Sequence, residues 1–128
     1  TRKESSAASD VYKRQESRQP IPKTVGELVM CVYSNLARIY ARELKQLEDL
    51  SGKTIDYLHV VGGGSNVSLL NQLTANLIGK EVIAGPGEAT AIGNILVQMI
   101  SVGEFENLSQ ARHWLASSSS FECYRPQI

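Results

Sequence analysis

The feature that most constrains the fold is a short apolar run that stops at three consecutive glycines. Residues 55–61 alternate at first and then become continuously apolar, as a largely buried β-strand does. The sequence GGGSN follows at residues 62–66, and a helical pattern with leucines on one side then runs to Gly79. Residues 81–84 form a second strand pattern. Strand, helix and strand at this spacing predict a right-handed βαβ unit with parallel strands.

A long amphipathic helix is expected before this unit. Thr24 and Glu27 have the spacing of a capping box, and apolar residues then recur every three or four positions as far as Leu50. Gly52 supplies the end of the helix. The pattern predicts one straight helix, about 40 Å long at ~1.5 Å per residue.

Two more helices are predicted after the second strand. One begins at Glu88, after a Gly-Pro-Gly turn, and ends before Gly103. The other is capped by Ser109 and runs to about Ser117. We expect residues 117–128 to be an extended segment on the surface, with the serines at 117–120 as a flexible connector.

The predicted fold class is therefore α/β, with a βαβ unit, a long N-terminal helix and C-terminal helices. Two parallel strands make a poor sheet by themselves, so the chain is expected to be part of a larger domain. Residues 1–18 have few large hydrophobic side chains and are expected to be a disordered or non-native tail. Residues 19–128 are expected to be the folded part.

Charge and composition exclude several classes of function. Among 128 residues, 13 Lys and Arg balance 13 Asp and Glu, and the absence of net positive charge argues against a nucleic-acid partner. No apolar run approaches the ~20 residues of a membrane span. Cys31 and Cys123 form neither a CxxC pair nor a disulfide framework, and no secretory signal is apparent, which favours the cytoplasm.

The glycine turn is the predicted ligand site. Gly62, Gly63 and Gly64 allow a ligand close to the backbone, and the helix that follows favours an anion such as phosphate. We expect these glycines, together with Ser65 and Asn66, to bind a nucleotide; the alternative is a tight turn without a ligand. A dinucleotide fingerprint would need glycine where Val67 stands, and no Walker A lysine follows the glycines.

Other candidate residues are weaker. Glu88 lies at the second turn, on the same predicted edge, but an acidic residue pairing with the helix dipole is the simpler interpretation. His59 and His113 are far apart and have no ligand-spaced partners, so no metal site is predicted. No set of catalytic residues can be assembled from the chain.

Four segments resemble the C-terminal domain of the FGGY-type carbohydrate kinases. They are residues 60–66 (VVGGGSN), 69–73 (LLNQL), 82–89 (VIAGPGEA) and 93–95 (GNI), and the resemblance extends over about residues 19–126. Within the family, the likeness is greatest to the branch that phosphorylates L-rhamnulose.

The resemblance implies a partial ribonuclease-H-like lobe of the actin-like ATPase fold and an ATP-dependent kinase. It implies that Gly62, Gly63 and Gly64 contact ATP, with Ser65 and Asn66 near the purine. The reaction would transfer the γ-phosphate, with Mg²⁺, to a ketose such as L-rhamnulose.

The catalytic aspartate and the N-terminal lobe of that family have no counterpart in this chain. The fragment is therefore expected to be inactive, with exposed sheet edges that favour self-association. The alternatives are a kinase of the same family for xylulose or ribulose, and an interaction module that keeps the fold without catalysis.

Overall fold

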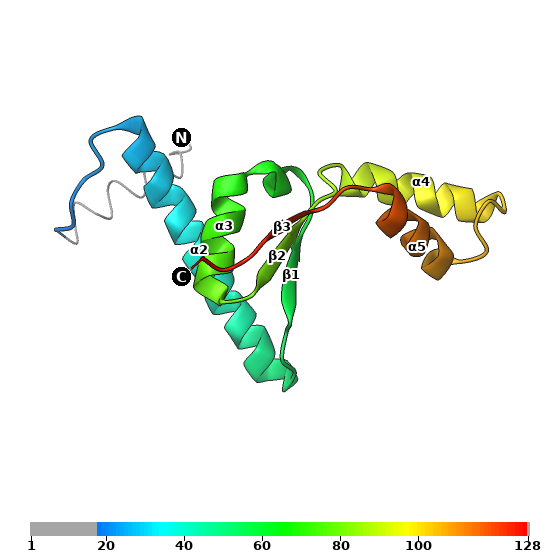
Figure 1. The fold of residues 1–128 in the computed structure, drawn as a ribbon, viewed down its shortest axis with the longest axis horizontal. Helices are drawn as coiled ribbons and strands as arrows, with labels where there is room; N and C mark the ends of the chain where they lie inside the picture. The colour runs from blue at the N-terminus through cyan, green and yellow to red at the C-terminus, as the bar shows by residue number, and fades with distance from the viewer. Residues whose placement is uncertain (1–17, 128) are drawn as a thin grey trace, which may run out of the picture.

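Three layers of secondary structure make up the main body of the chain, and a pair of helices extends from it (Figure 1). The computed structural model describes residues 18–127. The predicted tail at residues 1–18 therefore lies, except for Arg18, outside the described residues. In chain order, the described elements are α2 (Val25–Ser51), β1 (Tyr57–Val60), the 3₁₀ helix η1 (Gly63–Asn66), α3 (Ser68–Ile78), β2 (Glu81–Ala84), α4 (Ala89–Ser101), α5 (Leu108–Ser118) and β3 (Glu122–Tyr124).

The structure confirms the predicted βαβ unit. Strands β1 and β2 are parallel neighbours, with Tyr57 opposite Glu81 and Val60 opposite Ala84, and α3 makes the crossover between them. Gly79 ends α3 in the left-handed conformation (φ 66°), which a glycine adopts without steric cost.

The sheet has a third strand that the sequence analysis did not predict. Residues 117–128 were expected to be an extended surface segment, but Glu122–Tyr124 pair antiparallel with β2, and Cys123 lies opposite Ile83. The strand order is β1-β2-β3. The expectation of an extended segment at the surface is confirmed for residues 122–124, which are mostly exposed, whereas Ser117 and Ser118 belong to α5 and the pairing with β2 was not predicted.

Helix α2 begins and ends as its sequence predicts. Thr24 Oγ1 accepts a hydrogen bond from the Glu27 amide at 3.1 Å, and the Glu27 carboxylate accepts one from the Thr24 amide, also at 3.1 Å. These backbone donors, together with that of Lys23, hold the pKa of Glu27 below its ordinary value. Gly52 ends the helix with φ 66°.

The core lies where α3 packs between α2 and the sheet. Val82, in the middle strand, is fully buried. Much of the apolar stripe of α2, including Val25 and Leu50, is nevertheless exposed, because α3 covers only part of the longer helix. The buried hydrophobic residues are Cys31, Ala37, Leu44, Leu70, Ala75, Val82, Ala84, Leu96 and Ala111.

Helices α4 and α5 pack against each other and extend away from the sheet (Figure 1). The side chain of Asn107 accepts a hydrogen bond from the Gln110 amide at 3.0 Å and caps α5. The predicted cap, Ser109, is wrong, since Ser109 already lies within the first turn of this helix. Glu88 is the N-cap residue of α4, but its side chain makes no capping hydrogen bond.

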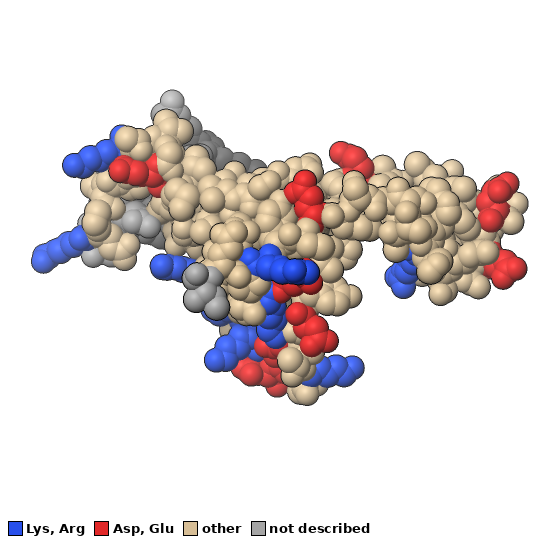
Figure 2. All heavy atoms as spheres, viewed as in Figure 1, with Lys and Arg blue, Asp and Glu red and all other residues tan. Residues whose placement is uncertain are grey.

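The surface carries charges of both signs. Figure 2 shows acidic and basic side chains interspersed below the sheet, and few charges on the helix pair except near its tip. Cys31 is buried and Cys123 is exposed, and no disulfide joins them. Within residues 18–127, no helix is long and apolar enough to cross a membrane.

Candidate functional site

The glycine turn and the Gly-Pro-Gly turn lie side by side at one edge of the sheet. The Gly62 amide donates a hydrogen bond to the Pro86 carbonyl at 3.0 Å, and the Gly85 amide donates one to the Val60 carbonyl at 2.9 Å. These two bonds continue the parallel pairing of β1 and β2 beyond the ends of the strands. The prediction that both turns occupy the same edge is confirmed.

The backbone of the glycine turn faces outward. Gly62 has φ 79°, and after it the chain forms one 3₁₀ turn in which the Ser65 amide donates to the Gly62 carbonyl at 2.9 Å. Gly63 and Gly64 are exposed, and their amides donate no hydrogen bond to any residue that the structure describes. A Cβ at Gly62, Gly63 or Gly64 would meet no atom within 4 Å, so a ligand has room to approach this backbone.

Ser65 lies behind this outward-facing backbone. It is 4% exposed, and its hydroxyl donates to the Gly62 carbonyl at 2.7 Å. The Ser65 carbonyl in turn accepts a hydrogen bond at 2.8 Å from the carboxamide of the buried Asn71 in α3. The hydroxyl of Ser65 thus shapes the turn, while its immediate neighbour Asn66 is exposed.

A cleft of about 520 Å³ opens beside the two turns. The Asn66 side chain crosses from η1 to the second turn, where its Nδ2 lies 3.2 Å from the position that a Cβ on Gly87 would occupy. The link between α5 and β3 also lines the cleft, and its Ser120 carbonyl oxygen lies 3.7 Å from the position of a Cβ on Gly85. The lining residues are Ser65, Asn66, Ser68, Ala84, Gly85, Pro86, Gly87, Ser118, Ser119, Ser120 and Glu122.

His59 supports the second turn from within the sheet. One imidazole nitrogen of His59 lies 2.6 Å from the Gly85 carbonyl, and the ring meets the Phe121 ring edge-on with centroids 5.7 Å apart. A carbonyl only accepts, so this nitrogen carries the proton and donates it. His59 is therefore a structural contact of the cleft wall, and His113 lies well away on α5.

The cleft contains one acidic side chain, Glu122, which accepts a hydrogen bond from the Tyr124 hydroxyl. Among residues 18–127, no three His, Cys, Asp or Glu side chains come together as metal ligands. The polar groups that the turn offers a ligand are mainly backbone amides and the Asn66 carboxamide. Such donors suit an anionic or strongly polar ligand.

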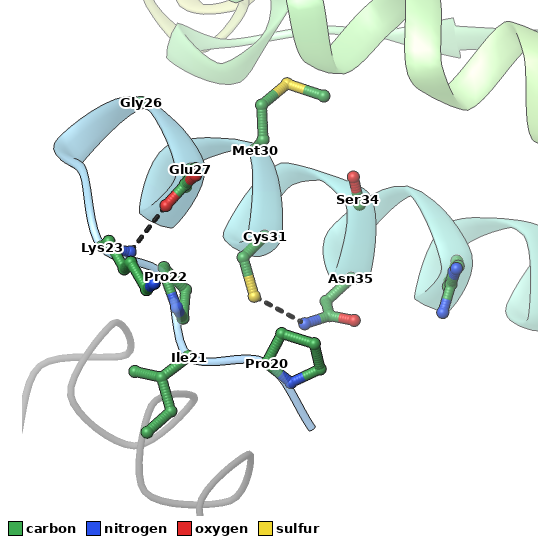
Figure 3. Close-up of a pocket in the computed structure, with 11 residues that line it drawn as sticks. Pro20, Ile21, Pro22, Lys23, Gly26, Glu27, Met30, Cys31, Ser34 and Asn35 are labelled. Atoms are coloured by element: carbon green, nitrogen blue, oxygen red, sulfur yellow. Dashed lines mark hydrogen bonds between the residues drawn. The ribbon is translucent and has the colours of Figure 1, made fainter. Parts of the chain in front are cut away.

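Two other hollows lie away from the turns. The larger, about 770 Å³, lies between residues 20–23 and the first turns of α2, where the Asn35 amide approaches the Cys31 sulfur at 3.8 Å (Figure 3). The smaller, about 350 Å³, is an apolar groove between α2 and β1. Neither contains a residue that the sequence singled out for binding, apart from His59 in the groove.

The sequence pointed to the five residues at 62–66 but not to two other parts of this site. Asn71 was not singled out, although a polar residue among the apolar positions of a helix is a signal of a buried hydrogen bond. The serines at 117–120 were expected to be a flexible connector, but Ser117 and Ser118 end α5, and Ser118, Ser119 and Ser120 line the cleft. Pairing of β3 with β2 brings them there, and local sequence does not encode that pairing.

The sequence of this chain is similar to those of known proteins. The profile of the FGGY family of carbohydrate kinases, C-terminal domain, matches residues 8–102. A rhamnulokinase of Ligilactobacillus salivarius and one of Lactiplantibacillus plantarum are each 50% identical over 113 residues, and one of Bacillus subtilis is 47% identical over 113 residues. Each match covers 88% of this chain and 23% of the relative, so the chain spans less than a quarter of those proteins.

The profile match includes α2, α3, both turns and all of α4, and therefore the whole of the site except residues 118–122, at the link between α5 and β3. The chain belongs to the FGGY family of carbohydrate kinases and carries the C-terminal domain of that family, in a form similar to that of rhamnulokinases.

Proposed function

We propose that the chain is the ATP-binding part of a sugar kinase that transfers the γ-phosphate of ATP to a ketose such as L-rhamnulose. The observation that carries this proposal is the pair of exposed residues Gly63 and Gly64, whose amides donate to no acceptor within residues 18–127 and which adjoin two residues of the cleft lining, Ser65 and Asn66. Family membership and the names of the relatives support the reaction class.

The two turns suggest how the nucleotide would bind. Backbone donors at Gly63 and Gly64 suit a phosphate, because both residues are exposed and a Cβ built on either would meet no atom within 4 Å. The adjacent cleft, with the Asn66 carboxamide at its rim, suits the polar edge of a purine. In this arrangement Gly62 and Ser65 bind indirectly, by fixing the turn from which the amides project.

Magnesium would enter with the nucleotide, since no three acidic, histidine or cysteine side chains gather among residues 18–127. The base that activates the sugar hydroxyl would come from elsewhere in the complete enzyme, because no residue of this chain matches it. We therefore infer that the 128-residue chain alone binds nucleotide weakly and transfers no phosphate. Catalysis of this type depends on positioning from both sides of the phosphates.

We infer that the complete fold is a ribonuclease-H-like lobe paired with an N-terminal lobe, in a cytoplasmic enzyme. The βαβ unit, with the long helix before it, supports that architecture. In this arrangement residues 19–128 are the nucleotide-side domain. A kinase of the same family for xylulose or ribulose is the alternative activity, and an interaction module without catalysis is the alternative class.

Titration of the chain with ADP, ATP and NAD, followed by NMR of backbone amides, tests the nucleotide site. We expect ADP and ATP, but not NAD, to shift the Gly63 and Gly64 resonances first. The variant Gly64→Ala adds a methyl group in open space. It should therefore keep its melting temperature while the Kd for ADP rises about tenfold, which corresponds to ~1.4 kcal/mol.

The matched control is Gly93→Ala, an exposed position in α4 where an added Cβ also meets nothing within 4 Å. This variant should bind ADP as the unmodified chain does. Equal binding by both alanine variants, or shifts confined to residues remote from the two turns, would exclude the glycine turn as the nucleotide site. If ADP shifts the Gly63 and Gly64 resonances but the complete enzyme transfers no phosphate, the interaction module is favoured.

A further inference from the structure

Asn71 is a polar residue in the middle of the core. Its side chain is 1% exposed, and it lies on the α3 face that also buries Leu70 and Ala75. Burying a carboxamide among apolar groups costs free energy unless its polar atoms are hydrogen bonded. The bond that Asn71 makes is to the Ser65 carbonyl, six residues earlier and outside the helix.

From Asn71, a chain of hydrogen bonds leads to the glycine turn. Asn71 Nδ2 donates to the Ser65 carbonyl at 2.8 Å, and the Ser65 hydroxyl donates to the Gly62 carbonyl at 2.7 Å. The Ser65 amide donates to the same carbonyl at 2.9 Å. Ser65 is thereby attached to α3, Gly62 is attached to Ser65, and the amides of Gly63 and Gly64 lie between these two residues.

Thr74 shows that burial of a polar side chain in α3 does not by itself involve the turn. Thr74 is also 1% exposed, one helical turn beyond Leu70, and its hydroxyl donates to the Leu70 carbonyl at 2.7 Å. That bond stays within α3 and contributes only to the helix and its packing. Asn71 differs because its hydrogen bond leaves the helix and ends on the backbone of the proposed site.

We propose that Asn71 is a positioning residue, which fixes the 3₁₀ turn so that the Gly63 and Gly64 amides converge on one anionic group of the ligand. This proposal rests on the proposed function, because that function identifies the ligand as a nucleotide phosphate. Donors that are already held in place bind an anion without first being ordered, and so lose less affinity to conformational entropy.

The test compares Asn71→Leu with Thr74→Val in the full 128-residue chain. Both variants remove a buried hydrogen bond and keep the number of heavy atoms in the side chain, so both should lower the melting temperature. Only Asn71→Leu should raise the Kd for ADP, about tenfold, when binding is measured well below both unfolding transitions. In ligand-free protein, only Asn71→Leu should also speed hydrogen exchange at Ser65 and Val67, whose amides close the turn.

Equal loss of ADP affinity in the two variants would overturn the proposal. Unchanged hydrogen exchange at the Ser65 and Val67 amides of Asn71→Leu would also overturn it. If the unmodified chain binds no ADP, the proposed function fails, and the exchange rates at Ser65 and Val67 alone decide the positioning role. If Asn71→Leu does not fold, Asn71→Ala removes the same donor with a smaller side chain and takes its place. Its turn amides should exchange faster, and unchanged rates at Ser65 and Val67 in that variant would refute the proposal.

Discussion

At the scale of single residues, the glycines of the two turns serve different purposes. Gly62 and Gly85 have φ values of 79° and 112°, which side-chain-bearing residues rarely adopt. Gly63, Gly64 and Gly87 do not have a positive φ, so their backbone conformation does not require glycine. The surroundings of these three residues explain the lack of a side chain better. The first group shapes the turns, and the second keeps their outer surface open.

This difference predicts that two alanine substitutions in the second turn destabilise the chain to different extents. Gly85→Ala should lower the free energy of unfolding by about 1–2 kcal/mol, the cost of a left-handed residue with a Cβ. Gly87→Ala should cost less, because its Cβ meets only the mobile end of the exposed Asn66 side chain, at 3.2 Å. Urea denaturation of both variants measures the difference, and a larger loss in Gly87→Ala would contradict this account.

Much of the site could be predicted from sequence because glycine, serine and asparagine at residues 62–66 act locally. A glycine triplet after a strand predicts an open turn wherever the rest of the chain lies. The roles of Asn71 and of the serines at 118–120 depend instead on which segments meet in space. Those contacts are set by packing of the whole domain, which short sequence patterns do not record.

At the scale of elements, the predictions were accurate where a local signal existed. The capping box of α2 and the glycine ends of α2 and α3 formed as expected. For α5 two residues had capping side chains, and Asn107, not Ser109, received the Gln110 amide. Strand β3 was missed because three residues carry no clear alternation, and their pairing partner β2 lies about 40 residues earlier.

A cluster of charge and backbone groups joins α2 to the sheet. Glu48 Oε1 lies 2.5 Å from Lys80 Nζ and accepts from the Ile55 amide at 2.7 Å, and the Lys80 ammonium also donates to the Ile55 carbonyl. Lys80 first, and the Ile55 amide second, lower the pKa of Glu48 below its ordinary value of 4.5. The end of α2, the start of β1 and the α3–β2 turn are thereby connected.

The lowered pKa predicts a loss of stability in acid. The ionised carboxylate is favoured in the folded state, so its contribution is present above pH 4.5 and is lost as pH falls through the folded-state pKa. Between about pH 5 and about pH 3, the melting temperature of Glu48→Gln should fall less steeply than that of the unmodified chain. Glu43→Gln, at an exposed pair with Arg42, is the control. The same acid slope in all three proteins would contradict a role for Glu48.

At the scale of the whole molecule, the sheet is open on one side. Strand β1 forms an edge of the described sheet, and Tyr57 and Val61 at its two ends are 54% and 51% exposed. The apolar groove between α2 and β1 lies next to this edge. An unpaired strand beside apolar surface is a template for pairing with another chain.

We therefore expect the 128-residue chain to self-associate through β1. Sedimentation velocity over a range of concentrations should show a shift from monomer to dimer or larger species. Val61→Lys should move that shift to higher concentration, since a charge at the edge opposes pairing. Val102→Lys, at a 76% exposed position just after α4, should leave it unchanged. A greater effect of Val102→Lys would place the contact on the helix pair.

The helix pair α4–α5 is joined to the sheet by only two stretches of backbone, residues 85–88 and 119–121. Residues of both stretches line the 520 Å³ cleft, and a Cβ on Gly85 would lie 3.7 Å from the Ser120 carbonyl oxygen, so the two stretches are neighbours. Any rotation of the pair about these two connections would therefore move part of the cleft lining. A molecule bound to residues of both stretches would resist such rotation, and would thereby restrict the orientation of the far tip of α4 and α5.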